Sequence, residues 1–526
     1  MKRRDFIKNT VPVAVMPALL GGYSVTALGN SPLLQALAGA TLTDNVLVLV
    51  QMNGGNDGLN MVIPLDQYSN LSNARSNILI PSNKVLSLTG TSATGLHPAM
   101  TGLRDMFNNG VASIVQGVCY PTPNFSHFRA TDIWLTASDS KQVLNTGWAG
   151  RYLANEYPNF PTGYPNTTMP DPLAIQIGST ISSGFQGPIT NMGMAISDPT
   201  NFYNLVTGVQ DPAPNTHAGK ELTYVRTVAQ QTQQYSAAIK AAALKVTSQN
   251  PYPTNNSLAD QLKIVARLIA GGLKTRIYMV STGGYDTHSV QVQSGSPELG
   301  SHAVLLQRLS DAIKAFHDDC KFLGIHNRVM GMTFSEFGRR VKSNASLGTD
   351  HGAAAPLFVF GSPVKPGIIG SNPIIPATVT ANDNVPMQYD FRSVYSSLLQ
   401  DWFCVPDSDL NSIMLKNFQK LPLVANACTP VSGIHEQNQQ AGINLISNYP
   451  NPFVSSTTIT FETQGGHTLV EVYDMTGRSI KVLVDGDYEK GTYTTTFNGH
   501  GLPPGNYYAR LQNGPIQQVR AMMIVR

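Results

Sequence analysis

Apolar runs that alternate with amphipathic helical patterns are the feature that most constrains how residues 41–425 can fold. A continuous apolar run is typical of a strand that is buried on both faces of a sheet. Between two of these runs, apolar residues recur at helical spacing over residues 302–317 and predict a crossover helix. Strands that alternate with helices predict an α/β domain with a mostly parallel sheet. The runs that predict strands lie at residues 45–50, 112–115, 276–280 and 329–334.

Charged residues are few and almost balanced in this chain. Only 13% of the 526 residues are charged, about half of the ~25% of a typical soluble domain, whereas 42% are hydrophobic and can build a core. The net charge of +3 is already supplied by residues 2–8, so the rest of the chain is neutral. We therefore expect no basic face for nucleic acid. No window reaches ~18 unbroken apolar residues, so we expect no internal transmembrane segment.

The N-terminus has the order of an export signal. A basic segment with Arg3 and Arg4 precedes an apolar stretch at residues 11–20 and a small-residue segment that ends at Ala40. The arginine pair resembles a twin-arginine signal, which predicts residues 1–40 as signal peptide and the twin-arginine translocase as a partner. Cleavage after Ala40 is expected, with Ala27 as an earlier alternative. A basic amphipathic start with a chance arginine pair is the competing interpretation.

The C-terminal part differs in composition from the rest. Residues 426–443 are predicted as a linker, and the alternating strands beyond them predict a small β-sandwich over residues 444–526. Three segments resemble the C-terminal sorting domain of type IX secretion substrates. That resemblance implies the type IX secretion machinery as a partner, and a path through the periplasm to the cell surface or the medium. A fibronectin-like adhesion module is the alternative. The segments are residues 449–453 (Tyr-Pro-Asn-Pro-Phe), 472–478 and 502–507.

Acids, hydroxyls and histidines follow the predicted strands of the large region. Since ligands bind at the carboxyl ends of strands in open parallel sheets, we expect these segments to converge on one crevice. Carboxylates and imidazoles without thiolates suit zinc first, with calcium, magnesium and manganese as alternatives. The candidate metal ligands are Asp57, His127, Asp286, His288, Asp350 and His351.

Such a site would suit hydrolysis of an anionic ester. Two cations would hold the oxygens of a phosphate or sulfate group, and one would lower the pKa of Ser126 to make it a nucleophile. Ser126 precedes a predicted helix, whose N-terminus would also attract the anion. Arg129, one turn further on, would clamp an anionic oxygen.

The order Asp57, Ser126, Asp286-x-His288 and Asp350-His351 resembles the alkaline phosphatase and sulfatase superfamily. Further motifs resemble an uncharacterised, twin-arginine-exported branch of it. The resemblance implies an alkaline-phosphatase-like fold, with helices on both faces of the sheet, and an exported metal-dependent hydrolase of phosphate or sulfate esters. It implies one metal at Asp57, Asp350 and His351 beside Ser126, and a second at Asp286 and His288. The further motifs are residues 97–98, 124–129, 147–151, 335–339 and 390–395.

Departures from the family pattern leave alternatives open. The Asp and His of the second metal site lie two apart where four is common, and His127, His302 or His97 could supply its third ligand. Asn53 could take the place of Asp57. The segment at residues 119–123 lacks the arginine of a formylglycine sulfatase, which we exclude. A catalytically silent surface protein that binds or assembles other molecules is therefore the alternative function.

Several of these residues also have purely structural interpretations. Asp57 could set a turn, Ser126 could cap a helix, and Glu336 could pair with Arg339 or Arg340. Asp390 is expected to cap the next helix. The four cysteines could be buried thiols, or Cys404 and Cys428 could form a disulfide. Residues 157–214 are expected to shape the substrate pocket.

Overall fold

The computed structural model describes residues 19–20, 23–24, 44–158, 160–197, 235–428, 445–451, 453–474, 478–514 and 516–525. The chain forms two compact units, one over residues 43–428 and one with residues 1–42 and 429–526. The predicted signal peptide lies outside the described residues, apart from the strand pair β1 (Leu19–Leu20) and β2 (Tyr23–Ser24). Most of the predicted linker lies outside them too. Over the described ranges, no helix has the length and apolar character needed to cross a membrane.

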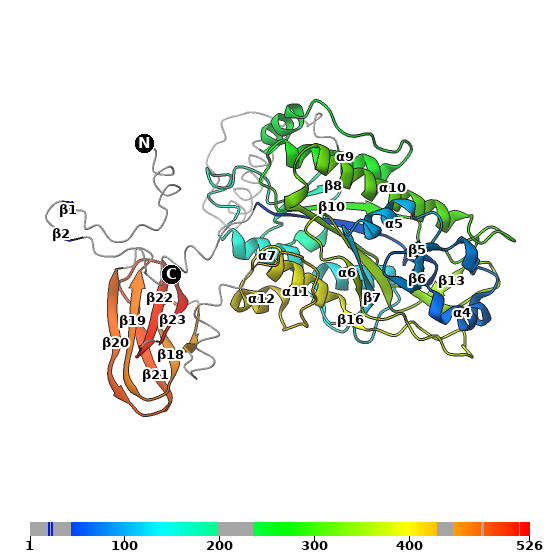
Figure 1. Cartoon of the computed structure of the whole chain (residues 1–526). Coiled ribbons are helices and arrows are strands. Elements are labelled where there is room, and N and C mark those ends of the chain that lie inside the picture. The colour runs from blue at the N-terminus through cyan, green and yellow to red at the C-terminus, as the bar shows by residue number, and fades with distance from the viewer. Residues whose placement is uncertain are drawn as a thin grey trace, which may run out of the picture. The chain divides into compact units, whose positions relative to one another are not determined.

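A nine-stranded sheet forms the centre of the large unit (Figure 1). Eight strands follow the order β15-β7-β14-β11-β3-β10-β8-β9, and the ninth, β16, pairs with β7. Only β14 runs antiparallel to its neighbours, so the prediction of a mostly parallel sheet is confirmed. The strands are β3 (Val46–Met52), β7 (Ala112–Cys119), β8 (Ala174–Ile177), β9 (Gly193–Ile196), β10 (Ile277–Thr282), β11 (Val329–Phe334), β14 (Ala355–Phe360), β15 (Gly367–Ile369) and β16 (Tyr389–Asp390).

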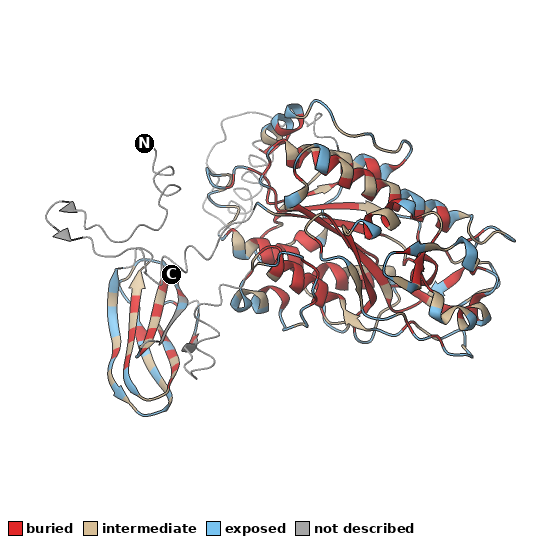
Figure 2. Cartoon of the chain, viewed as in Figure 1, coloured by how far each residue is buried: buried red, intermediate tan, exposed pale blue. Residues whose placement is uncertain are grey.

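Helices cover both faces of this sheet (Figure 1). Side chains alternate along a strand, so Val46, Val48 and Val50 of β3 pack with one set of helices while Leu47 and Leu49 pack with the other. Strands β3, β7 and β11 are buried along their whole length, as the continuous apolar runs predict (Figure 2). The first set is α5 (Thr101–Asn108), α9 (Ser257–Ala270) and α10 (Ser301–Phe322); the second is α6 (His127–Thr136), α7 (Trp148–Glu156), α11 (Phe391–Asp401) and α12 (Asp407–Met414).

Shorter strands and helices complete the large unit. A three-stranded sheet pairs β4, β6 and β5, and an antiparallel pair, β12 and β13, follows β11. Their bounds are β4 (Val62–Pro64), β5 (Leu86–Leu88), β6 (Thr91–Leu96), β12 (Arg339–Ser343) and β13 (Thr349–His351). The remaining helices are α3 (Gly58–Met61), α4 (Tyr68–Arg75), and the 3-10 turns η1 (Leu65–Gln67), η2 (Ser82–Lys84), η3 (Ser183–Phe185) and η4 (His326–Arg328).

Two details of the large unit agree with the sequence analysis. The Asp390 side chain accepts a hydrogen bond from the Arg392 amide and caps α11. Cys404 and Cys428 form a disulfide, with their Cα atoms 5.4 Å apart. Cys119 and Cys320 are free and buried.

The C-terminal unit consists of two antiparallel sheets around one core, as predicted for a β-sandwich. One sheet has the order β17-β18-β21 and the other β20-β19-β22-β23. Apolar residues of both sheets, such as Ile459, Phe497, Val472 and Leu511, share the core. The strands are β17 (Leu445–Tyr449), β18 (Ser456–Thr463), β19 (Gly466–Asp474), β20 (Ser479–Tyr488), β21 (Gly491–Asn498), β22 (Gly505–Asn513) and β23 (Ile516–Ile524).

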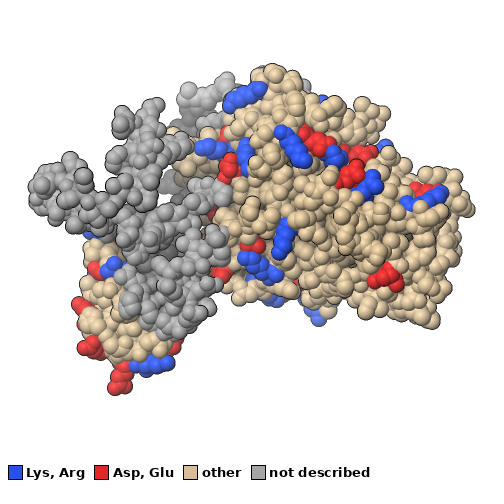
Figure 3. Space-filling model, viewed as in Figure 1, with Lys and Arg blue, Asp and Glu red and all other residues tan. Residues whose placement is uncertain are grey.

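The surface reflects the low content of charged residues. On the face shown in Figure 3, lysines and arginines lie scattered among aspartates and glutamates between wide uncharged areas. Uncharged residues therefore form most of the surface on this face.

Candidate functional site

Loops from four strands meet at one edge of the large sheet. Strands β11, β3 and β10 are parallel neighbours, and β7 runs in the same direction because two antiparallel pairings through β14 separate it from β11. The segments after these strands therefore start from the same edge, as expected from their sequence. They bring His127, Asp286, His288, Asp350 and His351 into one cluster, which we call the His/Asp cluster.

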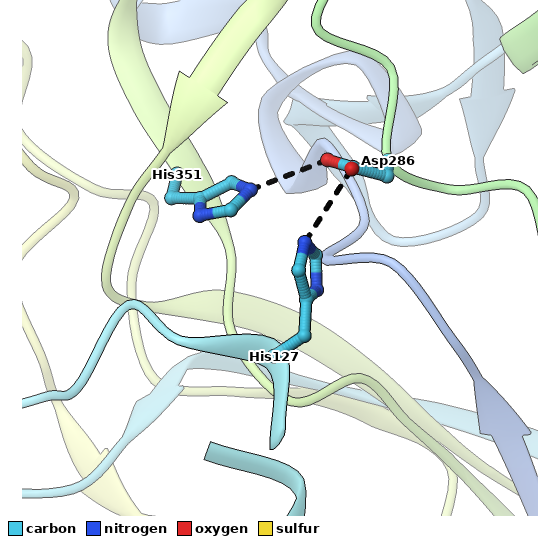
Figure 4. A group of neighbouring side chains, drawn as sticks. All are labelled: His127, Asp286 and His351. Carbon is cyan, nitrogen blue, oxygen red and sulfur yellow. Dashed lines mark hydrogen bonds and ion pairs between the residues drawn. The ribbon is translucent and has the colours of Figure 1, made fainter. Parts of the chain in front are cut away.

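Asp286 lies at the centre of the His/Asp cluster. The Nε2 atoms of His288 and His351 lie 3.1 and 3.2 Å from its Oδ1, and Nε2 of His127 lies 3.4 Å from its Oδ2. The ligating atoms of His127, Asp286 and His351 all lie within 4.8 Å of one another. Figure 4 shows both of these imidazoles pointing at the carboxylate. Two imidazole nitrogens and a carboxylate are a donor set that suits zinc and similar divalent metals.

Arg339 holds the central carboxylate in place. Its buried guanidinium donates to Oδ1 of Asp286 at 2.7 Å and to the backbone oxygens of Gly55, Thr349 and Tyr285. Burial raises the pKa of Asp286, but hydrogen bonds from Arg339 and His351 and the charge of Arg339 outweigh it and lower the pKa to about 2. The carboxylate is thus ionised at neutral pH and able to bind a cation.

Oxygen atoms contact the other ring nitrogen of each histidine. Nδ1 of His127 lies 2.8 Å from Oε1 of Glu336, and Nδ1 of His351 lies 2.8 Å from the Phe125 carbonyl oxygen. Nδ1 of His288 lies 3.3 Å from Oδ1 of Asp350. Asp350 is therefore in the cluster but on the outer side of His288.

Asp57 does not join the cluster, which corrects its predicted role as a metal ligand. It is 1% exposed, and both of its oxygens accept from Nη1 of Arg75, at 2.9 and 2.8 Å. Nε2 of Gln291 donates to Oδ2 at 2.7 Å. Burial raises the pKa of Asp57, but the charge and hydrogen bonds of Arg75 lower it below its usual value. A carboxylate sealed by an ion pair has no oxygen left for a cation.

Ser126 lies beside the cluster. It is the exposed N-cap residue of α6, and its side chain makes no capping hydrogen bond. Its neighbours on both sides contact the cluster, because the carbonyl of Phe125 meets His351 and the ring of His127 meets Asp286. Ser126 thus lies between two residues that contact the cluster, and its hydroxyl does not cap the helix.

Arg129 is directed away from the cluster, which corrects its predicted role as an anion clamp. Its guanidinium pairs with Asp132 and donates to Ser138 and to the backbone oxygens of Asp139 and Ser140. These contacts tie α6 to the segment that follows it. Arg339 is the guanidinium that reaches the cluster instead.

The alternative ligands His97 and His302 lie in the buried layer with Asp57. Nε2 of His302 lies 2.9 Å from Oδ1 of Asn56, and the rings of His97 and His302 are in edge contact. Desolvation lowers the pKa of His302 to about 4, and desolvation together with the nearby His302 lowers that of His97 to about 3. Asn53, the alternative to Asp57, links its backbone to β10 through Thr282 and to Tyr285.

Acidification should destabilise the large unit through these two histidines. In the unfolded chain they bind protons near pH 6.5, whereas in the folded chain they stay neutral until pH 4 or below. Their neutral burial thus contributes stability above pH 6.5 that is lost as pH falls toward the folded pKa. Between pH 7 and pH 5 we expect a loss of about 2 kcal/mol for each histidine.

Urea denaturation of the full chain, followed by tryptophan fluorescence, measures this loss. The chain has three tryptophans, Trp134, Trp148 and Trp402, all in the large unit, so the signal reports on that unit alone. The variant His302→Gln should show a smaller difference between the two pH values. An unchanged difference would contradict the assignment.

Glu336, Arg339 and Gly54 were not predicted as site residues. The buried Glu336 accepts from the Gly54 amide at 2.8 Å as well as contacting His127, and does not pair with Arg339 or Arg340. Gly54 has φ +124°, and a Cβ there would lie 2.3 Å from the Asp286 amide nitrogen, so only glycine fits. Gly54 and Glu336 follow strand ends closely, which was the available signal, whereas Arg339 begins β12 and had no such signal.

The other predicted features are not part of the cluster. Cys119, at the start of the sulfatase-like segment, is buried, and desolvation raises the pKa of its thiol to about 12. Of the predicted pocket-shaping stretch at residues 157–214, the structure describes residues 157–158 and 160–197, which include β8 and β9. Residue 159 and residues 198–214 lie outside the described residues.

Two solved structures that match this chain are distant from it in sequence. A protein in the alkaline phosphatase superfamily from Vibrio parahaemolyticus is 10% identical, with a TM-score of 0.32, over 91% of this chain and 82% of that chain. A sulfatase from Pseudoalteromonas sp. is 10% identical, with a TM-score of 0.32, over 89% and 86%.

PorZ, an essential bacterial surface component of the type-IX secretion system of Porphyromonas gingivalis, is also similar in part. It is 18% identical, with a TM-score of 0.13, over 20% of this chain and 14% of that chain, so the chain spans a small fraction of PorZ. No curated protein matches the chain.

Family comparison assigns much of the large unit and the C-terminal unit. Residues 447–525 match the secretion system C-terminal sorting domain, which confirms the predicted sorting domain and indicates export to the cell surface or secretion. Residues 120–411, more than half of the chain, match the family described as protein of unknown function (DUF1501). The chain therefore belongs to the DUF1501 family and carries a C-terminal sorting domain for secretion.

Proposed function

We propose that the protein is an exported, metal-dependent hydrolase of phosphate or sulfate esters. The observation that carries the proposal is the convergence of three imidazole Nε2 atoms on one ionised carboxylate, beside an exposed serine at a helix N-terminus. Such a combination offers a metal site, a nucleophile and an anion-binding helix end at one edge of a sheet.

The side chains of the cluster fit a divalent metal. His127, Asp286 and His351 would hold it, and zinc is the first choice because its sites combine imidazole nitrogen with carboxylate oxygen. Calcium, magnesium and manganese are the alternatives. A bound cation would supply Lewis acidity at the oxygens of the ester.

Ser126 would be the nucleophile in a two-step displacement. In the first step its oxygen bonds to phosphorus or sulfur while the bond to the ester oxygen breaks; the serine proton passes to solvent and the leaving alcohol takes a proton from water. In the second step a water oxygen bonds to phosphorus or sulfur, the bond to Ser126 breaks and the serine oxygen regains a proton. Free backbone amides in the first turn of α6 would hold the anionic group.

Features at both ends of the chain support a route of export. The sorting domain implies the type IX secretion machinery as a partner. The basic N-terminus, with Arg3 and Arg4, supports passage through the twin-arginine translocase into the periplasm first. Because twin-arginine export carries folded proteins, the metal would be loaded before crossing.

Hydrolysis assays on the purified full chain test the proposal. We expect turnover of an aryl phosphate or an aryl sulfate, loss of that turnover after a chelator, and recovery with zinc or another divalent metal. Asp286→Asn should lower turnover at least about 100-fold, because it removes the central charge of the cluster. Asp105→Asn is the matched control, since its side chain is also 47% exposed.

Absence of turnover with both esters in the metal-loaded protein would overturn the proposed hydrolysis. The catalytically silent surface protein would then be the better description. Equal turnover of Asp286→Asn and the unmodified chain would also overturn it, because the cluster would have no part in the reaction.

A further inference from the structure

We infer that the His/Asp cluster is a single-cation site, in which His288 is the fourth ligand beside His127, Asp286 and His351. Phe125, Glu336 and Asp350 act as positioning residues that orient the three imidazoles. The inference deepens the proposed function and rests on its metal dependence, but it differs from the two-cation arrangement that the sequence suggests.

The contacts of Asp286 have the spacing of neighbouring ligands of one ion. Its oxygens lie 3.1, 3.2 and 3.4 Å from the three Nε2 atoms. In a tetrahedral zinc site with bonds of about 2.0 Å, neighbouring ligand atoms lie about 3.3 Å apart. The Nε2 atoms of His288 and His351 are closer, at 2.8 Å, so these two rings would part slightly around an ion. His288 is not in the group of His127, Asp286 and His351 whose ligating atoms lie within 4.8 Å of one another, so it would move toward His127 around an ion.

All three histidines present the same nitrogen to the centre. In each ring Nδ1 contacts an oxygen atom, namely the Phe125 carbonyl, Oε1 of Glu336 or Oδ1 of Asp350. An oxygen at Nδ1 favours the tautomer with the proton there, which leaves the Nε2 lone pair free to bind a metal. Histidine ligands of metal sites have this second contact almost always. Because all three rings have an oxygen at Nδ1, their Nε2 atoms are all oriented to bind one metal ion.

Among the described residues, a second cation has no ligand set of its own. Asp57 is sealed by Arg75, and Asp350 contacts the Nδ1 side of His288 and Nδ2 of Asn344. Two-metal sites place their ions about 3.5–4 Å apart, with separate ligands for each. Asp286 and His351 would have to serve both ions here.

Arg339 adds an electrostatic reason. Its guanidinium lies 2.7 Å from Oδ1 of Asp286, and it is buried, so its charge is screened weakly. The side chains of Asp286, His288 and Asp350 are 47%, 44% and 57% exposed, so a single bound ion would still be open to an incoming substrate oxygen. One divalent cation balances the negative charge of the cluster. A second cation would be repelled by Arg339, with no further carboxylate to compensate its charge.

Metal stoichiometry of the full chain tests the inference without any enzymatic assay. Dialysis against zinc followed by elemental analysis should give one ion per chain, and competition with a chelating dye gives the affinity. His288→Ala should weaken zinc binding at least about 100-fold, and Glu336→Gln and Asp350→Asn should each weaken it about 10- to 100-fold. His467→Ala is the matched control, because its Nε2 contacts a carboxylate at 3.2 Å outside the cluster.

Two ions per chain would overturn the inference, as would unchanged affinity in His288→Ala. The half-exposed position of His288 makes this variant compatible with folding, and the far-UV circular dichroism spectrum verifies it. Failure of the inference and failure of the proposed hydrolysis are distinguishable. One tightly bound zinc ion without ester turnover supports the single-cation site and contradicts the hydrolase.

Discussion

Replacement of Ser126 by alanine is expected to lower ester turnover by on the order of 10³-fold or more while zinc binding is unchanged. Ser126 is exposed and does not cap α6 with its side chain, so its hydroxyl contributes little to folding. His127 is the proposed metal ligand in the same turn. The ring of His127 contacts Glu336 and not Ser126. The variant should therefore separate the chemical step from metal binding.

The matched control is Ser257→Ala. Ser257 is also an exposed serine at the N-terminal end of a helix, α9, but it lies outside the cluster. Its turnover and zinc content should equal those of the unmodified chain. Rapid-quench analysis with labelled aryl phosphate should show a labelled protein with Ser126 present and none in Ser126→Ala.

Full turnover in Ser126→Ala would contradict the serine nucleophile. Direct attack by water on the ester would then be the better mechanism, and the metal cluster would keep its proposed role. Loss of both turnover and zinc would instead mean that Ser126 helps to build the site, which its lack of a capping contact argues against.

Strands and helices of the large unit could be predicted from the sequence because each depends on a local pattern of apolar residues. The apolar run at residues 329–334 coincides with β11, and the helical pattern at residues 302–317 lies inside α10. Parallel strands place their carboxyl ends on one edge, so the meeting of Asp286 with His351 also followed from topology. The insertion of the antiparallel β14 between β7 and β11 could not be predicted, since strand order depends on contacts between distant segments.

The partners of individual side chains were harder to predict than their neighbourhood. Asp57 follows a strand end as Asp286 does, yet Arg75 of α4 reaches it and seals it. Arg129 and Arg339 both lie near candidate ligands in the sequence. The guanidinium of Arg129 donates to the Asp139 carbonyl, whereas that of Arg339 donates to Asp286. Side-chain direction and burial decide these pairings, and neither can be read from spacing alone.

The second large effect concerns the buried ion pair of Arg75 and Asp57. Replacement of Arg75 by methionine is expected to reduce the free energy of unfolding of the large unit by about 3–5 kcal/mol. The side chains of Arg75 and Asp57 are 0% and 1% exposed. Removal of the guanidinium leaves an ionised carboxylate in the core with Gln291 as a neutral donor. It also frees the carbonyls of Arg340 and Val341, which Arg75 binds.

Tryptophan fluorescence during urea denaturation measures this change in the large unit alone. Arg104→Met is the control, since Arg104 pairs with Asp105 at the surface, and its loss should be below about 1 kcal/mol. The double variant Asp57→Leu with Arg75→Met should be more stable than Arg75→Met, because no charge is left buried without a partner. A single variant as stable as the control would contradict the structural role of Asp57.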